Sequence, residues 1–227
     1  MAEAPNPGET RQESTAAPGR RGFEGARARQ RTAAAVREVE SQTGAEVVVA
    51  LRPISGHYRH ADYLFGLVTG LAALAGLLYL PVDFPLAVFP VDVAIGFAVG
   101  TVLCSWLPSL RRRLVVPSLL RENVRRAARA AFVDLGVGRT SGRTGMLVYI
   151  SLFERRVEVV ADIGLDFSVV ERRWSEAVGA LQSGVSPRYN FERLISALRG
   201  LGPVLECVAP RSPDDVNELP DERMSCF

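Results

Sequence analysis

Two apolar runs decide the architecture of this chain: YLFGLVTGLAALAGLLYL at residues 63–80 and VAIGFAVGTVLCSWLPSL at residues 93–110. At a rise of about 1.5 Å per residue, each run spans about 27 Å as a helix, close to the roughly 30 Å hydrocarbon core of a bilayer. A buried core helix is rarely so long and so free of charge. The connecting residues 81–92 contain three prolines and two aspartates, which indicates a turn between two membrane spans.

Arginines flank the two apolar runs on their outer sides only. Arg52 and Arg59 precede the first run, three consecutive arginines at 111–113 follow the second, and the connection carries no positive residue. By the positive-inside rule, we expect both termini and the soluble part in the cytoplasm. Residues 1–34 lack the basic start and apolar core of a signal peptide. The sequence therefore predicts a two-span protein of a bacterial inner membrane with a cytoplasmic soluble domain.

Each apolar run also carries two glycines four residues apart. Gly66 and Gly70 lie in the first run, and Gly96 and Gly100 lie in the second. Small residues at this spacing let two helix backbones approach closely within a membrane. The spacing favours packing of the two spans against each other, and a homodimer through the same four glycines is the alternative.

The composition excludes several kinds of partner and catalytic site. The formal net charge is only +2, so the chain as a whole does not indicate a nucleic-acid partner. All 27 basic residues are arginine, which excludes a lysine Schiff base, a Walker lysine and a Ser–Lys dyad. Cys104, Cys207 and Cys226 show no CxxC spacing, and neither a disulfide nor a zinc site is expected in a reducing compartment.

The hairpin is expected to divide one soluble domain into two sequence segments. The first segment covers 27–56, the transmembrane hairpin 57–113 and the second segment 114–209. Because the hairpin returns the chain to the side it left, both segments can fold together around it. Residues 1–26 and 210–227 are expected to be disordered, the latter as an acidic tail that is either solvated or used for docking.

Hydrophobic spacing in the soluble segments predicts both helices and strands. Residues 46–51 are β-rich, and 146–152 and 156–161 are two strands whose short connection requires an antiparallel hairpin. The expected order is helix, strand, membrane hairpin, helix, strand, strand, helix, helix. Apolar residues at helical spacing place the helices at 28–39, 120–135, 170–181 and 191–201.

Five segments carry a pattern that points to a known family. The pattern comprises VESQTGAEVVV at 39–49, FVDLGVG at 132–138, TGMLVYISL at 144–152, ERRVEV at 154–159 and ADIGLD at 161–166. It resembles the TPM domain, whose thylakoid-lumen, photosystem-repair and receptor-modulating members show a W-G-I-G-like turn, N-G-V-L-L-L and D-R-K-V-R-I strands, and T-G-Y-G-L-E. The resemblance covers nearly the whole split domain. It implies an α/β fold with a small central sheet and helices on both faces.

Three positions depart from the pattern of that family. Leu135 replaces the aromatic residue of the turn, Thr144 replaces the Asn before Gly145, and Asp162 stands in the place of the first Gly. Relatives in the family have been described as divalent-cation-binding proteins, as acid phosphatases and as helpers in the assembly or repair of membrane complexes. The fold alone does not choose among these activities.

Three aspartates are candidate ligands for a divalent cation. Asp162 and Asp166 flank Gly164 after the second hairpin strand, and Asp134 lies at the end of the preceding helix. Carboxylate oxygens brought together by a sharp turn suit Ca²⁺ or Mg²⁺. The alternative is that these acids cap turns and helices, since Asp166 directly precedes a helix start. The sequence requires no other cofactor.

Two further motifs have structural interpretations. The Gly-rich stretch at 136–145 runs from a helix into a strand, whereas a phosphate-binding loop runs from a strand into a helix so that the helix N-terminus faces the anion. Nucleotide binding is therefore not expected. His57 and His60 are the only histidines, and without further ligands nearby they are expected to pack at the membrane interface rather than bind zinc.

The soluble part shows no machinery for Ser or Cys hydrolysis, because it contains no histidine and no Gly-x-Ser-x-Gly motif. We expect a non-catalytic module for binding, assembly or quality control of a membrane complex, with the bilayer and a membrane protein as partners. The alternative is a divalent-cation-dependent acid phosphatase, in which the three aspartates hold the cation and Arg139 or Arg143 binds the ester. Arginines on the helix after the hairpin are expected to meet lipid headgroups or solvent: Arg121, Arg125, Arg126 and Arg129.

Overall fold

A computed structural model describes residues 25–79, 85 and 87–211. Most of the two predicted disordered tails, and residues 80–84 and 86 around the expected turn, lie outside the described residues. The elements follow the expected order, with four additional short elements: the helices α4 and α8 and the 3-10 helices η2 and η3. In chain order, the elements are α1 (Ala26–Glu40), β1 (Glu46–Arg52), α2 (Arg59–Tyr79), α3 (Val88–Trp106), α4 (Pro108–Leu114), α5 (Pro117–Asp134), the 3-10 helix η2 (Val137–Arg139), β2 (Gly145–Ser151), β3 (Arg156–Ala161), the 3-10 helix η3 (Phe167–Val170), α6 (Glu171–Val185), α7 (Phe191–Arg199) and α8 (Gly202–Val208).

The three strands form one small sheet in the order β1-β2-β3. β1 pairs in parallel with β2, with Glu46 opposite Gly145, although the apolar hairpin lies between the two strands in the sequence. β2 pairs antiparallel with β3, with Met146 opposite Ala161, as the short connection between them predicts. β1 and β2 are buried along almost their entire length, which accounts for their continuous apolar sequences.

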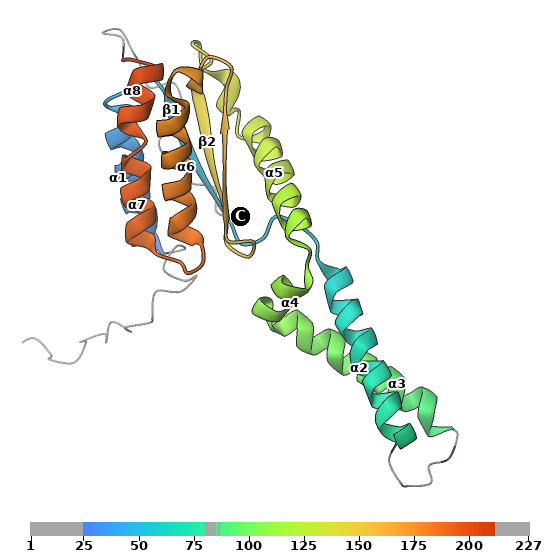
Figure 1. The fold of residues 1–227 in the computed structure, drawn as a ribbon. Coiled ribbons are helices and arrows are strands. Elements are labelled where there is room, and N and C mark those ends of the chain that lie inside the picture. Colours follow the sequence, from blue (N-terminus) through green and yellow to red (C-terminus); the bar gives the residue numbers. More distant parts are fainter. Residues whose placement is uncertain (1–24, 80–84, 86, 212–227) are drawn as a thin grey trace, which may run out of the picture.

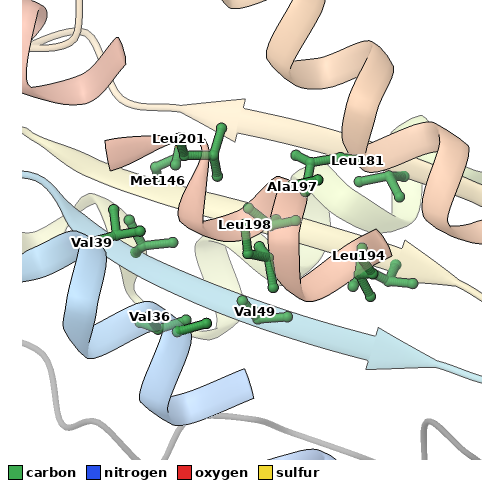
Figure 2. Close-up of a cluster of buried hydrophobic side chains, with 14 of the residues drawn as sticks. Val36, Val39, Val49, Met146, Leu181, Leu194, Ala197, Leu198 and Leu201 are labelled. Carbon is green, nitrogen blue, oxygen red and sulfur yellow. The ribbon is translucent and has the colours of Figure 1, made fainter. Parts of the chain in front are cut away.

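Helices cover both faces of the sheet, so the expected α/β fold is confirmed (Figure 1). α1, α6, α7 and α8 pack on one face, and α5 packs on the other. Figure 2 shows the first core, where Val36 of α1, Val49 of β1 and Leu198 of α7 lie together. Burial of each such side chain contributes about 1.5–3 kcal/mol, so this core holds together segments that lie on either side of the hairpin in the sequence.

Local signals set most of the helix ends. Gly136 follows α5 with a φ of 64°, a left-handed conformation that glycine adopts without strain. The side chain of Asn190 caps α7 by accepting a hydrogen bond of 3.0 Å from the backbone N–H of Arg193. The stretch predicted as one helix over 191–201 ends at Arg199 instead, and a separate helix, α8, follows it with a proline in its first turn.

α2 and α3 lie side by side and extend away from the sheet (Figure 1). Both helices are long and apolar enough to cross a membrane, by length and composition. α3 begins five residues before the predicted start at 93, because Pro90 lies in its first turn, where the missing N–H is not needed. It ends before the predicted 110, because Leu107 leaves helical geometry immediately before Pro108 opens α4.

The four glycines of the apolar runs lie at the contact between α2 and α3. A Cβ on Gly96 would approach the Cα of Gly70 to 3.1 Å, and a Cβ on Gly100 would approach the Cα of Gly66 to the same distance. Thr69 donates a hydrogen bond of 2.8 Å across this contact to the carbonyl oxygen of Gly96. The glycines therefore serve packing within the hairpin, and a homodimer through the same residues stays a prediction.

Candidate functional site

A buried carboxyl group joins the sheet to the start of the hairpin. Glu154 lies in the turn between β2 and β3 and is only 3% exposed. One carboxyl oxygen accepts hydrogen bonds from the backbone N–H of Ser55 at 2.9 Å and from the hydroxyl of Tyr58 at 2.7 Å. The other oxygen accepts a hydrogen bond from the hydroxyl of Ser151. Both oxygens are thus satisfied by neutral donors, two of which precede α2.

Further hydroxyl groups extend this junction network. The Ser55 hydroxyl donates to Ser151 Oγ at 2.6 Å and lies 3.0 Å from the hydroxyl oxygen of Tyr149. Because the single hydrogen of Ser55 is used on Ser151, Tyr149 is the donor in the second contact. Burial raises the pKa of Tyr58, which also hydrogen-bonds the side chain of Asn123. We use "junction network" for this set: Ser55, Tyr58, Asn123, Tyr149, Ser151 and Glu154.

Apolar contacts surround the junction network. The ring of Tyr58 stacks on Phe153 with ring centroids 5.2 Å apart, and Ala61, Val115 and Leu120 complete this cluster. In α/β proteins, ligands commonly bind beyond the carboxyl ends of parallel strands. Here the chain's own side chains fill the space beyond the ends of β1 and β2. The hairpin is therefore attached at this end of the sheet.

A buried ion pair fixes the base of the hairpin next to the junction network. The guanidinium of Arg111 in α4 lies 2.8 Å from a carboxylate oxygen of Asp62 in the first turn of α2. Both side chains are largely shielded from solvent. A carboxylate in the first turn also interacts favourably with the helix dipole. The pair therefore holds α4 against α2. The sequence predicted only that the arginines at 111–113 flank the second apolar run.

The candidate cation ligand Asp162 is engaged by an arginine. Asp162 follows β3 and is 5% exposed, and Arg143 donates to both of its carboxylate oxygens from Nε and Nη2, each at 2.8 Å. The backbone N–H of Ile163 donates a third bond of 2.8 Å. These bonds, above all those from Arg143, lower the pKa of Asp162. The charge of this carboxylate is neutralised within the protein.

The other two candidate ligands have separate positions. Asp166 accepts a hydrogen bond of 2.9 Å from the backbone N–H of Ser168 at the start of η3, which is the capping role considered as the alternative. Asp134 is exposed at the end of α5. Among the described residues, no group of three or more His, Cys, Asp or Glu is arranged to hold a metal ion. Cation binding by Asp134, Asp162 and Asp166 stays a prediction.

The Gly-rich stretch at 136–145 connects α5 and η2 to β2, in the expected order. A Cβ on Gly145 would collide with the carbonyl of Val137, so this glycine permits close backbone packing. Arg143 adopts a left-handed conformation, with a φ of 54°, as it reaches Asp162. His57 and His60 are both exposed before and at the start of α2.

An open groove of about 690 Å³ lies between α5 and β3. Arginines outnumber acids along its walls, and burial together with the nearby charge of Arg121 lowers the pKa of Arg156. Like charges held this close favour an anionic partner. We call this surface the basic groove. Its charged lining is Arg121, Glu122, Arg125, Arg129, Arg156 and Glu158.

β3 is the edge strand beside the basic groove, and its outward backbone groups follow from the pairing pattern. The backbone N–H of Asp162 donates to the carbonyl of Gly145 at 2.9 Å, just beyond the paired residues. Hydrogen-bonded and non-hydrogen-bonded pairs alternate in an antiparallel ladder. Every second residue of β3 therefore directs its N–H and C=O away from β2. These residues are Val157, Val159 and Ala161.

One outward group of β3 is already used by a side chain. Gln182 of α6 accepts a hydrogen bond of 3.0 Å from the N–H of Val157. Within residues 25–79, 85 and 87–211, no strand pairs with the outward side of Val159 and Ala161. Sequence reasoning noted the arginines of α5 but missed their combination with an open strand edge, because the order of the strands was needed to see it.

No protein-family model matches this chain, and no curated protein matches it. Among solved structures, the chain is similar to the NMR structure of the BA42 protein from the psychrophilic bacterium Bizionia argentinensis, with a TM-score of 0.52. That likeness covers 86% of this chain and 90% of the other, at 16% sequence identity. At this identity the likeness concerns the fold alone, and membership of the TPM family stays a prediction.

Proposed function

We propose that this protein is a membrane-anchored, TPM-like binding module that takes part in the assembly or quality control of a membrane complex. In this proposal, α2 and α3 span the membrane. Only 22% and 11% of their most apolar windows are buried within the structure, unlike the core helices of a soluble protein. A bilayer would remove these exposed apolar side chains from water.

The orientation of the hairpin follows from its basic flanks. Arg59 opens α2, and Arg111, Arg112 and Arg113 lie in α4, so the arginines are at the end of the hairpin that joins the sheet. The positive-inside rule places such an end in the cytoplasm. The α/β domain and both termini are therefore cytoplasmic in this proposal, with a bacterial inner membrane as the location.

The observation that carries a binding function is the basic groove along an open strand edge. An extended segment added to β3 would form backbone hydrogen bonds with Val159 and Ala161. Acidic side chains of the same segment would reach arginines of α5 and form charge-assisted hydrogen bonds. The binding partner is accordingly an acidic, extended segment of a neighbouring membrane component. The phosphatase alternative finds no comparable arrangement, since Asp162 and Asp166 are engaged within the protein.

Affinity purification from native membranes tests this proposal. An Arg125→Glu, Arg129→Glu variant reverses two charges of the groove, and an Arg29→Glu, Arg173→Glu variant reverses two exposed charges elsewhere. We expect a stoichiometric membrane-protein partner with the unaltered chain and the control, and at least a tenfold loss with the groove variant. Equal recovery with all three proteins, or no partner with any of them, would contradict a binding function for this groove.

A further inference from the structure

We infer that the basic groove is also the docking site of the protein's own acidic C-terminal segment, residues 212–227. In this arrangement, the segment adds to the outward edge of β3 and competes with an external partner. The inference rests on the groove identified under the proposed function. It goes further by naming an occupant within the same chain and by making the groove self-regulated.

The described chain ends at the end of the sheet where β3 also ends, although it lies beside β1, the opposite edge strand. Pro210 forms an isolated antiparallel bridge with Thr43, just before β1 begins at Glu46. Glu46 lies opposite Gly145, the first residue of β2. The carbonyl of Gly145 in turn accepts the hydrogen bond from Asp162, the residue after β3. A segment that follows Arg211 therefore starts at the end of the sheet where β3 ends, beside β1 and two strands away from β3. After crossing that end, it would run antiparallel to β3.

The length of the segment is sufficient for this path. Sixteen residues follow Arg211, and an extended chain of that length spans about 50 Å. Crossing the end of the sheet from β1 to the outer side of β3 requires about 15 Å, and the six residues of β3 span about 20 Å. About 15 Å of the available length remains for the approach.

The chemistry of the segment matches that of the groove. Two prolines, Pro213 and Pro220, bound a run of six residues at 214–219, which equals the length of β3. Because proline lacks the N–H that a strand needs, pairing would use the later residues of this run, which are far enough from Arg211 to have crossed the end of the sheet. The arginines of the groove would meet the acidic side chains of the segment. Five acids accompany a single arginine, Arg223: Asp214, Asp215, Glu218, Asp221 and Glu222.

Lipid headgroups explain only part of the groove. α5 begins at Pro117 beside the hairpin and leads away from it (Figure 1). At about 1.5 Å per residue, Arg121 lies roughly 6 Å along the helix from Pro117, whereas Arg129 lies roughly 18 Å along it. A headgroup layer can meet the first of these arginines but not the second. A chain segment lying along β3 can meet both.

Hydrogen exchange of single amides in lipid nanodiscs tests the inference directly. The full chain is compared with a chain ending at Arg211. We expect the amides of Val159 and Ala161 to exchange at least tenfold faster in the shortened chain. The amide of Val157 serves as an internal control, since Gln182 holds it in both proteins. Equal exchange of Val159 and Ala161 in the two chains would overturn the inference, including when anionic lipid protects them equally in both.

A synthetic peptide of residues 212–227 gives the second measurement. Added to the shortened chain, it should restore the protection of Val159 and Ala161, and its affinity should fall at least tenfold for an Arg121→Glu, Arg125→Glu variant but not for Arg29→Glu. A scrambled peptide of the same composition should bind more weakly. Equal binding of the scrambled peptide would overturn strand pairing.

Partner recovery separates this inference from the proposed function. If the segment competes for the groove, purification of the shortened chain should recover more partner than purification of the full chain. Equal recovery of partner by the two chains would overturn self-docking while leaving the binding function intact. Absence of any partner, with protection of β3 by the segment, would support self-docking and count against the proposed function.

Discussion

Glu154 and Asp162 are buried carboxyl groups at opposite ends of the sheet, and they differ in what satisfies their hydrogen-bonding capacity. Glu154 accepts hydrogen bonds from neutral donors, Ser55, Tyr58 and Ser151, two of which belong to the approach to α2. Asp162, just after β3, forms an ion pair with the guanidinium of Arg143, just before β2. Loss of Glu154 would leave several buried donors unsatisfied, whereas loss of Asp162 would free an arginine that is already half exposed. The comparison indicates that Glu154 connects the β2–β3 turn to the segment before α2. Asp162, in contrast, stabilises only the turns near Arg143.

Replacement of Glu154 gives the largest expected effect. A Glu154→Ala variant leaves three donors without their acceptor, and at about 1 kcal/mol or more for each, the free energy of unfolding should fall by about 3 kcal/mol. Denaturant or thermal unfolding in one detergent measures this loss. Glu158→Ala, on the partly exposed side of β3, is the matched control and should change stability by less than about 0.5 kcal/mol. Similar losses in both variants would refute a special role for the junction.

Tyr58→Phe removes a single donor and should cost about 1 kcal/mol at neutral pH. Burial raises the pKa of Tyr58, so the folded protein retains the proton where the unfolded chain loses it. The stabilisation is fully present below about pH 10, the ordinary tyrosine pKa, and is lost as pH rises above it. The stabilities of the unaltered and variant proteins should therefore converge in alkali. A gap that persists to pH 11 would show that Tyr58 is not shielded as the structure indicates.

Asp162→Asn should produce the smallest loss of stability and a distinct acid dependence. The pKa of Asp162 is lowered by Arg143, so its contribution is present above about pH 3.9, the ordinary aspartate pKa, and disappears as pH falls through the lower folded value. The difference between the two proteins should shrink below pH 4. Arg143→Gln should show the same acid dependence, because it removes the other half of the pair. A loss of stability as large as that of Glu154→Ala would contradict the difference between the two carboxyl groups.

The parts of the fold that depend on local spacing could be predicted from the sequence. The two apolar helices, the β2–β3 hairpin and the helices on both faces follow from hydrophobic periods and a short connection. The break at Leu107 and the separate helix α8 could not be placed by the same means, since both lie within apolar stretches that continue the helical period. Helix ends in such stretches depend on a few backbone angles.

The polar sites could be predicted only in part, because their partners are distant in the sequence. Ser55 and Glu154 are 99 residues apart, and only the parallel pairing of β1 with β2 brings them together. Asp162 was identified as a candidate ligand from the chemistry of its carboxylate. The arginine that occupies it, Arg143, lies 19 residues earlier and could not be assigned to it from spacing alone.

The insertion of the hairpin between paired strands has a consequence for the biogenesis of this protein. Ninety-two residues separate the end of β1 at Arg52 from the start of β2 at Gly145. At about 5–20 residues per second, synthesis of this interval takes roughly 5–20 s, during which β1 waits without its neighbour. In the proposed topology, the strands meet only if both spans have crossed the bilayer, since a single crossing leaves them on opposite sides. Closure of the sheet would therefore act as a checkpoint for membrane insertion.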